Sequence, residues 1–118
     1  FLKLKSFKGY LDFLSSNSRG KFELRELFEV ITINETFFFR NQPQLDAVAG
    51  TIVPEILNDP KNSSKRKIKI WSAASSSGEE PYSMAMILDD LIKPKYPSLS
   101  FEIIGTDINY AVIETARK

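Results

Sequence analysis

The residues best suited to chemistry follow two predicted strands. An apolar strand ending at Trp71 runs into a turn of small residues, and a helix that begins with Glu79 and Glu80 follows directly. Asp107 comes directly after the second strand. Ligands of an open parallel sheet bind beyond the carboxyl ends of its strands. We therefore expect these carboxylates to lie at one ligand-binding edge.

The turn after Trp71 favours a cationic cofactor over a pyrophosphate. A pyrophosphate needs several approachable amides, whereas this turn has one glycine, Gly78, followed by two glutamates. S-adenosylmethionine carries an ammonium and a sulfonium group, which nearby carboxylates stabilise. It also carries a ribose, whose hydroxyls can donate hydrogen bonds to Asp107. Carboxylates also stabilise helix N-termini. This alternative stands for Asp107 taken alone, whereas Asp107 together with the turn favours the ribose, and it accounts for one of the glutamates more readily than for both.

Composition narrows the classes of function. With 118 residues, 42% of them hydrophobic, the chain is about one small globular domain. Its net charge of +1 gives no general reason to expect a nucleic-acid partner. The segment Lys61–Lys69 holds five basic residues and no acid, and we interpret it as a solvated loop.

The chain has no cysteine and no histidine. A disulfide framework and a thiolate metal site are thereby excluded, and the commonest general base and zinc ligand is missing, so we expect no metal. No apolar run approaches the ~20 residues that span a bilayer, and we expect no membrane insertion and a cytoplasmic location. Because the chain begins with Phe1 and stops at Lys118 within a helical pattern, we interpret it as a piece of a longer protein.

The first half of the chain reads as helical. Apolar residues at helical spacing predict helices over residues 7–14 and 24–31, separated by a polar loop over residues 15–20. We interpret their aromatic stripes as core packing. A third helix is predicted from Pro43, and Pro54 is expected to bend or end it.

The second half reads as a βαβ unit with parallel strands. Strands are predicted over residues 68–71 and 101–106, with a helix between them that stops before Pro94. Asn109 is expected to cap a last helix. The predicted fold class is therefore α/β, a βαβ unit preceded by a small helical subdomain.

Three segments together resemble the chemotaxis receptor methyltransferases, the CheR family. Asn34–Arg40 is similar to their N-x-T-x-F-F-R segment, and Trp71–Ser83 resembles their W-S-A…G-E-E-P-Y-S signature. Gly105–Asn109 is similar to their second cofactor motif. The resemblance implies a truncated Rossmann-like S-adenosylmethionine-dependent methyltransferase, with residues 1–32 as a partial helical domain and residues 33–118 as the linker and first half of the catalytic domain.

The resemblance also implies an activity and a site. The activity is methylation of glutamate side chains on the cytoplasmic helices of chemoreceptors, with S-adenosylhomocysteine as product. The implied cofactor contacts are Asn34, Thr36, Arg40, Glu80 and Asp107, and Arg40 is also expected close to the reacting methyl group. The structural alternatives are a helix cap for Asn34, a turn hydroxyl for Thr36 and a surface salt bridge for Arg40.

The expected chemistry needs no histidine. A glutamate is already ionised near neutral pH and can attack a sulfonium methyl without a general base, so positioning provides most of the catalysis. Our hypothesis is that Arg40 orients the incoming carboxylate through its fork of donors. Two other functions remain open, a module that binds or senses S-adenosylmethionine without methyl transfer, and a structural interaction domain.

Overall fold

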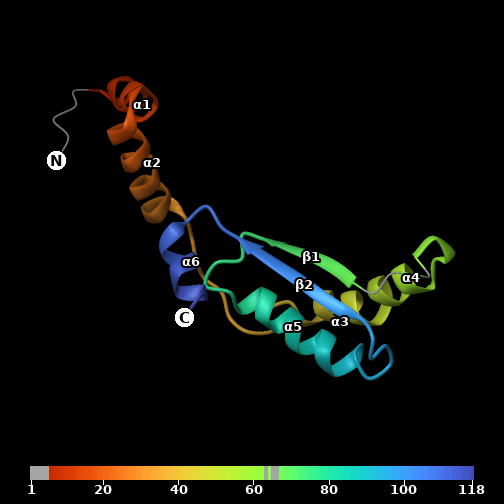
Figure 1. Ribbon diagram of the computed structural model, residues 1–118. Helices are drawn as coiled ribbons and strands as arrows, with labels where there is room; N and C mark the ends of the chain where they lie inside the picture. The colour runs from red at the N-terminus through yellow and green to blue at the C-terminus, as the bar shows by residue number, and fades with distance from the viewer. Residues whose placement is uncertain (1–5, 63, 65–66) are drawn as a thin grey trace.

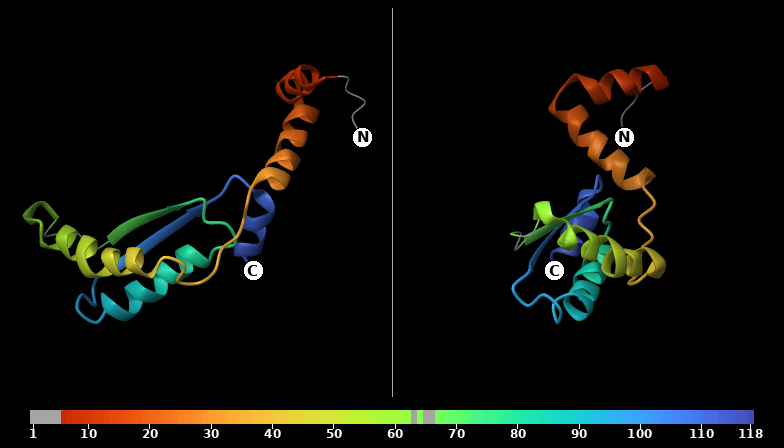
Figure 2. Two further views of the ribbon diagram at one scale, coloured as in Figure 1. Left: turned by 180° about the vertical axis from the view of Figure 1, so that it is seen from behind. Right: turned by 90° about the vertical axis from the view of Figure 1, so that its right-hand side faces the viewer.

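The computed structural model describes residues 6–62, 64 and 67–118. Two N-terminal helices, α1 (Phe7–Ser16) and α2 (Ser18–Ile31), form an arm that projects from one end of the sheet-containing part (Figure 2). The radius of gyration is 19.7 Å, whereas a compact domain of about 100 residues has one of about 13 Å. The molecule is therefore elongated along the arm.

The sheet consists of two parallel strands. Strand β1 (Lys67–Ala73) pairs with β2 (Ser100–Thr106), and the partners run in register from one end to the other. Helix α5 (Glu79–Leu91) connects the strands and lies along one face of the sheet (Figure 1). The predicted βαβ unit with parallel strands is thereby confirmed, within a mixed α/β arrangement.

One face of the sheet forms the core. Ile68, Ile70 and Ser72 on β1 are buried or half-buried, while the side chains that alternate with them are exposed. Helices α3 (Gln42–Ala47) and α4 (Val53–Asn58) contribute to the same core as α5. The buried hydrophobic side chains of this core are Leu45, Ala49, Val53, Ile68, Met84, Ile87, Leu88, Ile92 and Leu99.

Pro54 interrupts its helix without ending it. Between α3 and α4 the chain forms a π-helical turn, η1 (Val48–Ile52), and the Val53 amide bonds to the carbonyl of Val48, five residues earlier. Proline has no N–H to donate, and its ring clashes with the carbonyl four residues before it. The wider π turn accommodates Pro54 at the start of α4, so the chain remains helical to Asn58.

The opposite face of the sheet is open in the part of the chain that the structure describes. Trp71 and Ile104, which pair across the strands, are 72% and 47% exposed. Beside them, the Glu102 carboxylate lies 2.8 Å from the Lys67 ammonium and 3.3 Å from that of Lys69. These two ammonium groups, Lys67 foremost, hold the pKa of Glu102 below its usual value.

The predicted polar loop over residues 15–20 is wrong, because a single residue, Asn17, separates α1 from α2. Its side chain accepts hydrogen bonds from the amides of Arg19 and Gly20 at 2.9 and 3.1 Å and so begins the second helix at once. Gly20 is buried where the helices cross, and a Cβ there would lie 2.1 Å from the carbonyl oxygen of Phe13. This glycine allows close helix packing.

The interpretation of the first aromatic stripe as core packing is wrong for two of its residues. Leu14 is buried, but Phe7 and Leu11 are 95% and 64% exposed. The arm is only two helices thick, and no further layer of described residues covers that face. Helical periodicity therefore identified the helix but not the extent of its burial.

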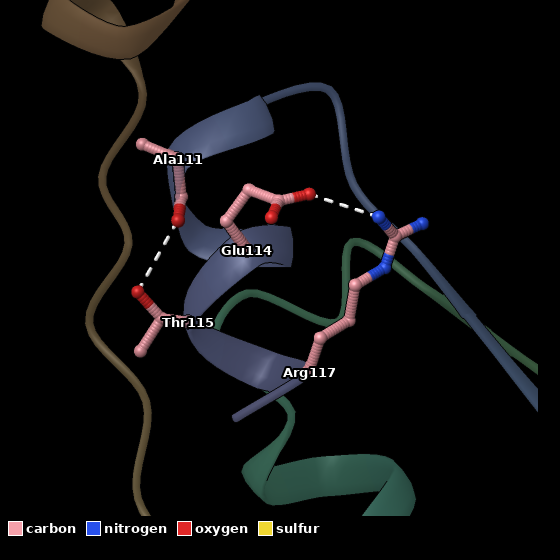
Figure 3. Close-up of polar contacts among 4 residues, drawn as sticks. All are labelled: Ala111, Glu114, Thr115 and Arg117. Atoms are coloured by element: carbon pink, nitrogen blue, oxygen red, sulfur yellow. Dashed lines mark hydrogen bonds and ion pairs between the residues drawn. The ribbon is translucent and has the colours of Figure 1, made fainter.

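Helix α6 (Tyr110–Ala116) follows β2 and is capped as predicted. The Asn109 side chain accepts a hydrogen bond from the Ala111 amide at 3.0 Å. At the other end, Arg117 donates to the carboxylate of Glu114 at 2.8 Å (Figure 3). The capping side chain therefore fixes the start of α6, and Arg117 is engaged on its own helix.

The end of α2 joins the arm to the rest of the molecule. The Arg25 guanidinium lies 4.6 Å from the ring centroid of Tyr110 on α6. The Asn109 side-chain amide donates to the hydroxyl of Thr32 at 3.1 Å. The residue that caps α6 thus also holds the segment that leaves the arm.

Only part of the basic segment can be placed. Lys61 lies in a short 3₁₀ turn, η2 (Pro60–Asn62), and Lys67 and Lys69 lie on the open face of the sheet. Lys65 and Arg66 lie outside the described residues. Among the residues that are described, no helix is long and apolar enough to cross a bilayer.

Candidate functional site

A cleft of about 640 Å³ lies at the carboxyl ends of the strands. Its walls come from the segment that leaves the arm, residues 32–41, from the turn after β1, and from the residues after β2. All five predicted site residues line it, namely Asn34, Thr36, Arg40, Glu80 and Asp107. The volume is typical of small-molecule sites. The structure thus brings together residues that are up to 73 positions apart in the sequence, from Asn34 to Asp107.

Three backbone amides of the turn after β1 are already engaged within the protein. The Ser75 amide donates to the carbonyl of Thr106 at 2.9 Å, and the Ser76 amide donates to the Asp107 carboxylate at 2.8 Å. The Gly78 amide donates to the Ser75 carbonyl at 3.0 Å. A phosphate would need such amides to be free, so the turn is unsuited to a pyrophosphate, in agreement with its acidic sequence.

The turn owes its shape to three residues with positive φ. Ala74 and Ser76 have φ values of 57° and 47°, and Gly78, at the start of α5, has 101°. A Cβ on Gly78 would also lie 3.1 Å from the ring of Tyr82. The first two positions are strained for L-residues, and the hydrogen bonds of the turn hold them in place.

The two glutamates of the turn have different surroundings. Glu80 lines the cleft, and one of its carboxylate oxygens accepts a hydrogen bond from the Ser72 hydroxyl at 2.6 Å. The Glu79 carboxylate accepts from the Ser77 hydroxyl at 2.8 Å, and Glu79 does not line the cleft. The helix-terminus alternative therefore suits Glu79, while Glu80 presents negative charge to the cleft.

Asp107 has a structural task in addition to its predicted one. Its carboxylate accepts hydrogen bonds from the backbone amides of Ser76 and Asn109. Each bond is 2.8 Å long, and each uses a different carboxylate oxygen. A carboxylate oxygen has two lone pairs, so each oxygen keeps one acceptor position. Asp107 can therefore fix the turn after β1 and still accept the hydroxyl groups of a ribose.

Asn34 and Thr36 lie in the extended segment between the arm and α3. The Asn34 carbonyl accepts from the Ser76 hydroxyl at 3.0 Å, and its side-chain amide donates to the Thr32 hydroxyl at 3.3 Å. Asn34 does not cap a helix, because the next helix begins at Gln42. The Thr36 hydroxyl makes no hydrogen bond with any residue that the structure describes, so it is available to the cleft.

Arg40 lies at the rim of the cleft with most of its donors free. Its guanidinium donates to the carbonyl of Glu35 and lies 5.6 Å from the ring centroid of Phe37. It forms no ion pair with a carboxylate among the described residues, so the salt-bridge alternative does not describe it. An arginine has five N–H donors, which leaves several for a bound anion.

Sequence reasoning missed the tasks of Ser72 and Ser83. Both side chains are buried, 6% and 1% exposed. Ser72 donates to Glu80, while Ser83 accepts a hydrogen bond from the Phe39 amide at 2.9 Å and donates to the Glu79 carbonyl at 2.6 Å. The available signal was periodicity, since each serine falls on the apolar face of its strand or helix.

The charges of the cleft suit a ligand with both positive and hydroxyl groups. Glu80 and Asp107 contribute carboxylates to the lining, and Arg40 contributes a cation. Among the described residues there is no cluster of three or more side chains able to hold a metal ion. The arrangement fits the positively charged methionine portion and the ribose of S-adenosylmethionine.

Comparisons with known proteins point to one family. The family model for the CheR methyltransferase, SAM binding domain, matches residues 34–118. A chemotaxis protein methyltransferase of Borreliella burgdorferi is 36% identical over 99% of this chain and 42% of its own length. A chemotaxis protein methyltransferase of Listeria monocytogenes is 34% identical over 98% of this chain and 41% of its own length. Chemotaxis protein methyltransferase 2 of Vibrio cholerae is 37% identical over 95% of this chain and 37% of its own length. The chain spans about two fifths of the length of these relatives.

Proposed function

The chain belongs to the CheR methyltransferase family, and on this premise we propose that it forms part of an enzyme that methylates glutamate side chains of chemoreceptors. Its methyl donor is S-adenosylmethionine, and S-adenosylhomocysteine is the product. In this proposal residues 33–118 are the first half of a Rossmann-like methyltransferase domain, and residues 1–32 belong to a helical domain before it. The receptor segments it modifies are cytoplasmic helices, so the enzyme acts in the cytoplasm.

The observation that carries the proposal is the shared cleft of the five site residues. Asp107 keeps one acceptor position on each carboxylate oxygen, which would hold the ribose hydroxyls, and the Glu80 carboxylate in the cleft would attract the positive charge of the methionine portion. Asn34 and Thr36 provide further polar groups in the lining of the cleft. The occupied amides of the turn argue against phosphate-containing cofactors, which favours a cofactor without phosphate.

Arg40 supplies the group that orients the substrate. When bound, S-adenosylmethionine supplies a methyl group on a positively charged sulfur. A glutamate carboxylate is ionised at neutral pH, so the site needs no base to activate it. The free guanidinium donors of Arg40 can hold that carboxylate by two parallel hydrogen bonds, which fixes its approach.

Two measurements on the complete protein test the proposal. Calorimetric titration with S-adenosylhomocysteine should show binding, and the absence of binding would leave only the structural interaction domain. Incubation with labelled S-adenosylmethionine and receptor membranes should then transfer label to receptors. Binding without transfer would instead favour the non-catalytic module of the same ancestry.

A further inference from the structure

The turn that carries Arg40 has an unusual backbone. Phe39, the residue before it, has a φ of 59°, in the left-handed region that residues with a Cβ avoid. Its side chain is 40% exposed, so burial of the ring does not explain the conformation. Something else must hold the backbone at the position that determines where Arg40 begins.

Ser83 contacts that backbone from helix α5. Its hydroxyl accepts the Phe39 amide at 2.9 Å and donates to the carbonyl of Glu79, one helical turn earlier, at 2.6 Å. The second bond fixes the orientation of the hydroxyl, which leaves a lone pair directed at the turn. Ser83 is 1% exposed, which places it among the most buried of the described side chains. Water therefore cannot readily take the place of its hydroxyl as the acceptor for the Phe39 amide.

The side-chain contacts of Arg40 lie within its own segment. The Arg40 guanidinium donates to the Glu35 carbonyl and lies over the Phe37 ring, both within the same segment. These contacts shape the turn but do not place it relative to the sheet. The hydrogen bond to Ser83 spans 44 positions of sequence and joins the turn to the helix that also carries Glu80.

We propose that Ser83 is a positioning residue for methyl transfer, which acts by fixing the Phe39 backbone and thereby the guanidinium of Arg40 over the cleft. Ser83 also lines the cleft, but its hydroxyl is engaged by the Phe39 amide and the Glu79 carbonyl. Its effect on turnover passes through Arg40, and this inference rests on the proposed function. Loss of the hydroxyl leaves the Phe39 amide without its acceptor and allows the turn to relax toward a less strained backbone.

A double-mutant cycle in the complete enzyme tests this dependence on Arg40. Turnover of labelled receptor membranes is measured at saturating S-adenosylmethionine for the wild type, Ser83→Ala, Arg40→Ala and the double variant. We expect Ser83→Ala to reduce kcat about 10- to 100-fold when Arg40 is present. In the Arg40→Ala background the same change should alter kcat less than about 2-fold, because the group being positioned is absent.

Ser77→Ala is the matched control. It also removes a serine hydroxyl near helix α5, but the hydrogen bond that it breaks is a local one to Glu79. It should leave turnover near the wild-type value. If Ser83→Ala lowers the unfolding midpoint too far for assay, Ser83→Cys keeps the shape of the side chain and a weak acceptor, with a slightly larger atom. The cycle run with Ser83→Cys should then show the same dependence on Arg40 with a smaller loss.

The outcomes separate this inference from the proposed function. Equal losses in both backgrounds, wild-type turnover in Ser83→Ala, or unchanged turnover in Arg40→Ala would each overturn the positioning role in an active enzyme. A wild-type enzyme that binds S-adenosylhomocysteine but labels no receptor would contradict the proposed function instead.

Discussion

Replacement of Asp107 by alanine should lower the free energy of unfolding as well as weaken cofactor binding. The carboxylate accepts the amides of Ser76 and Asn109 at 2.8 Å each, and Ser76 has a φ of 47° that these contacts hold. A hydrogen bond to a charged group contributes about 1.5–3 kcal/mol. Because Asp107 is half-buried and water can replace part of each bond, we expect a loss of about 2–4 kcal/mol in the free energy of unfolding.

Urea unfolding of the complete protein measures this loss. With a slope near 2 kcal/mol per molar urea, the midpoint of Asp107→Ala should fall by about 1–2 M. Asp89→Ala is the control, since that exposed carboxylate only pairs with Lys93, just beyond the end of α5, at 2.7 Å, and its removal should cost about 0.5 kcal/mol or less. A midpoint for Asp107→Ala equal to that of the control would refute the role of this carboxylate in holding the turn.

Three further predictions concern catalysis, packing and pH. Arg40→Ala should lower receptor methylation about 100-fold with an unchanged urea midpoint, because the guanidinium is exposed and pairs with no carboxylate among the described residues; turnover near wild type would exclude its orienting role. Gly20→Ala should cost about 2 kcal/mol or more by thermal unfolding, because the new Cβ would lie 2.1 Å from the Phe13 carbonyl; an unaltered midpoint would show that the helices can separate freely. Lys67 lowers the pKa of Glu102 in the folded state. The ion pair therefore stabilises the fold fully above pH 4.5, the usual pKa of glutamate, and this stabilisation is lost as the pH falls through the lower pKa of the folded state. Urea midpoints of Glu102→Gln should therefore decline less than those of the wild type below about pH 4.5, and parallel declines would contradict the ion pair.

Local patterns were sufficient for the elements that frame the cleft. Short apolar segments predicted both strands, and the Asn109 cap and the start of α5 followed from local residue preferences. The Pro54 interruption was expected, but its form was not. A π turn depends on how the helix packs on both sides of the proline, and sequence spacing does not report that packing.

The polar tasks inside the site could not be predicted in the same way. The sequence predicts Asp107 as a ribose ligand, but its bond from the Ser76 amide depends on a strained turn after the other strand, 31 positions away. The bond from Phe39 to Ser83 joins residues 44 positions apart. Such contacts form only when core packing has brought the helices and strands together. In the sequence they are indicated only by a serine at a position on the apolar face of a helix.

The small loop residues also had tasks that composition alone did not reveal. The sequence places Asn17 and Gly20 in a predicted polar loop because both residue types favour loops. In the structure one caps a helix and the other allows two helices to cross closely. Only the distance between the crossing backbones distinguishes these possibilities.

The most direct test of methyl transfer by this cleft is the chemistry of the product. The complete protein is incubated with methyl-labelled S-adenosylmethionine and receptor membranes, and the labelled receptor is then exposed to mild base. Transfer to a glutamate carboxylate forms a methyl ester, so the label should leave the receptor as volatile methanol. Label that stays on the receptor after base treatment, or receptors that acquire none while S-adenosylhomocysteine still binds, would contradict glutamate methylation.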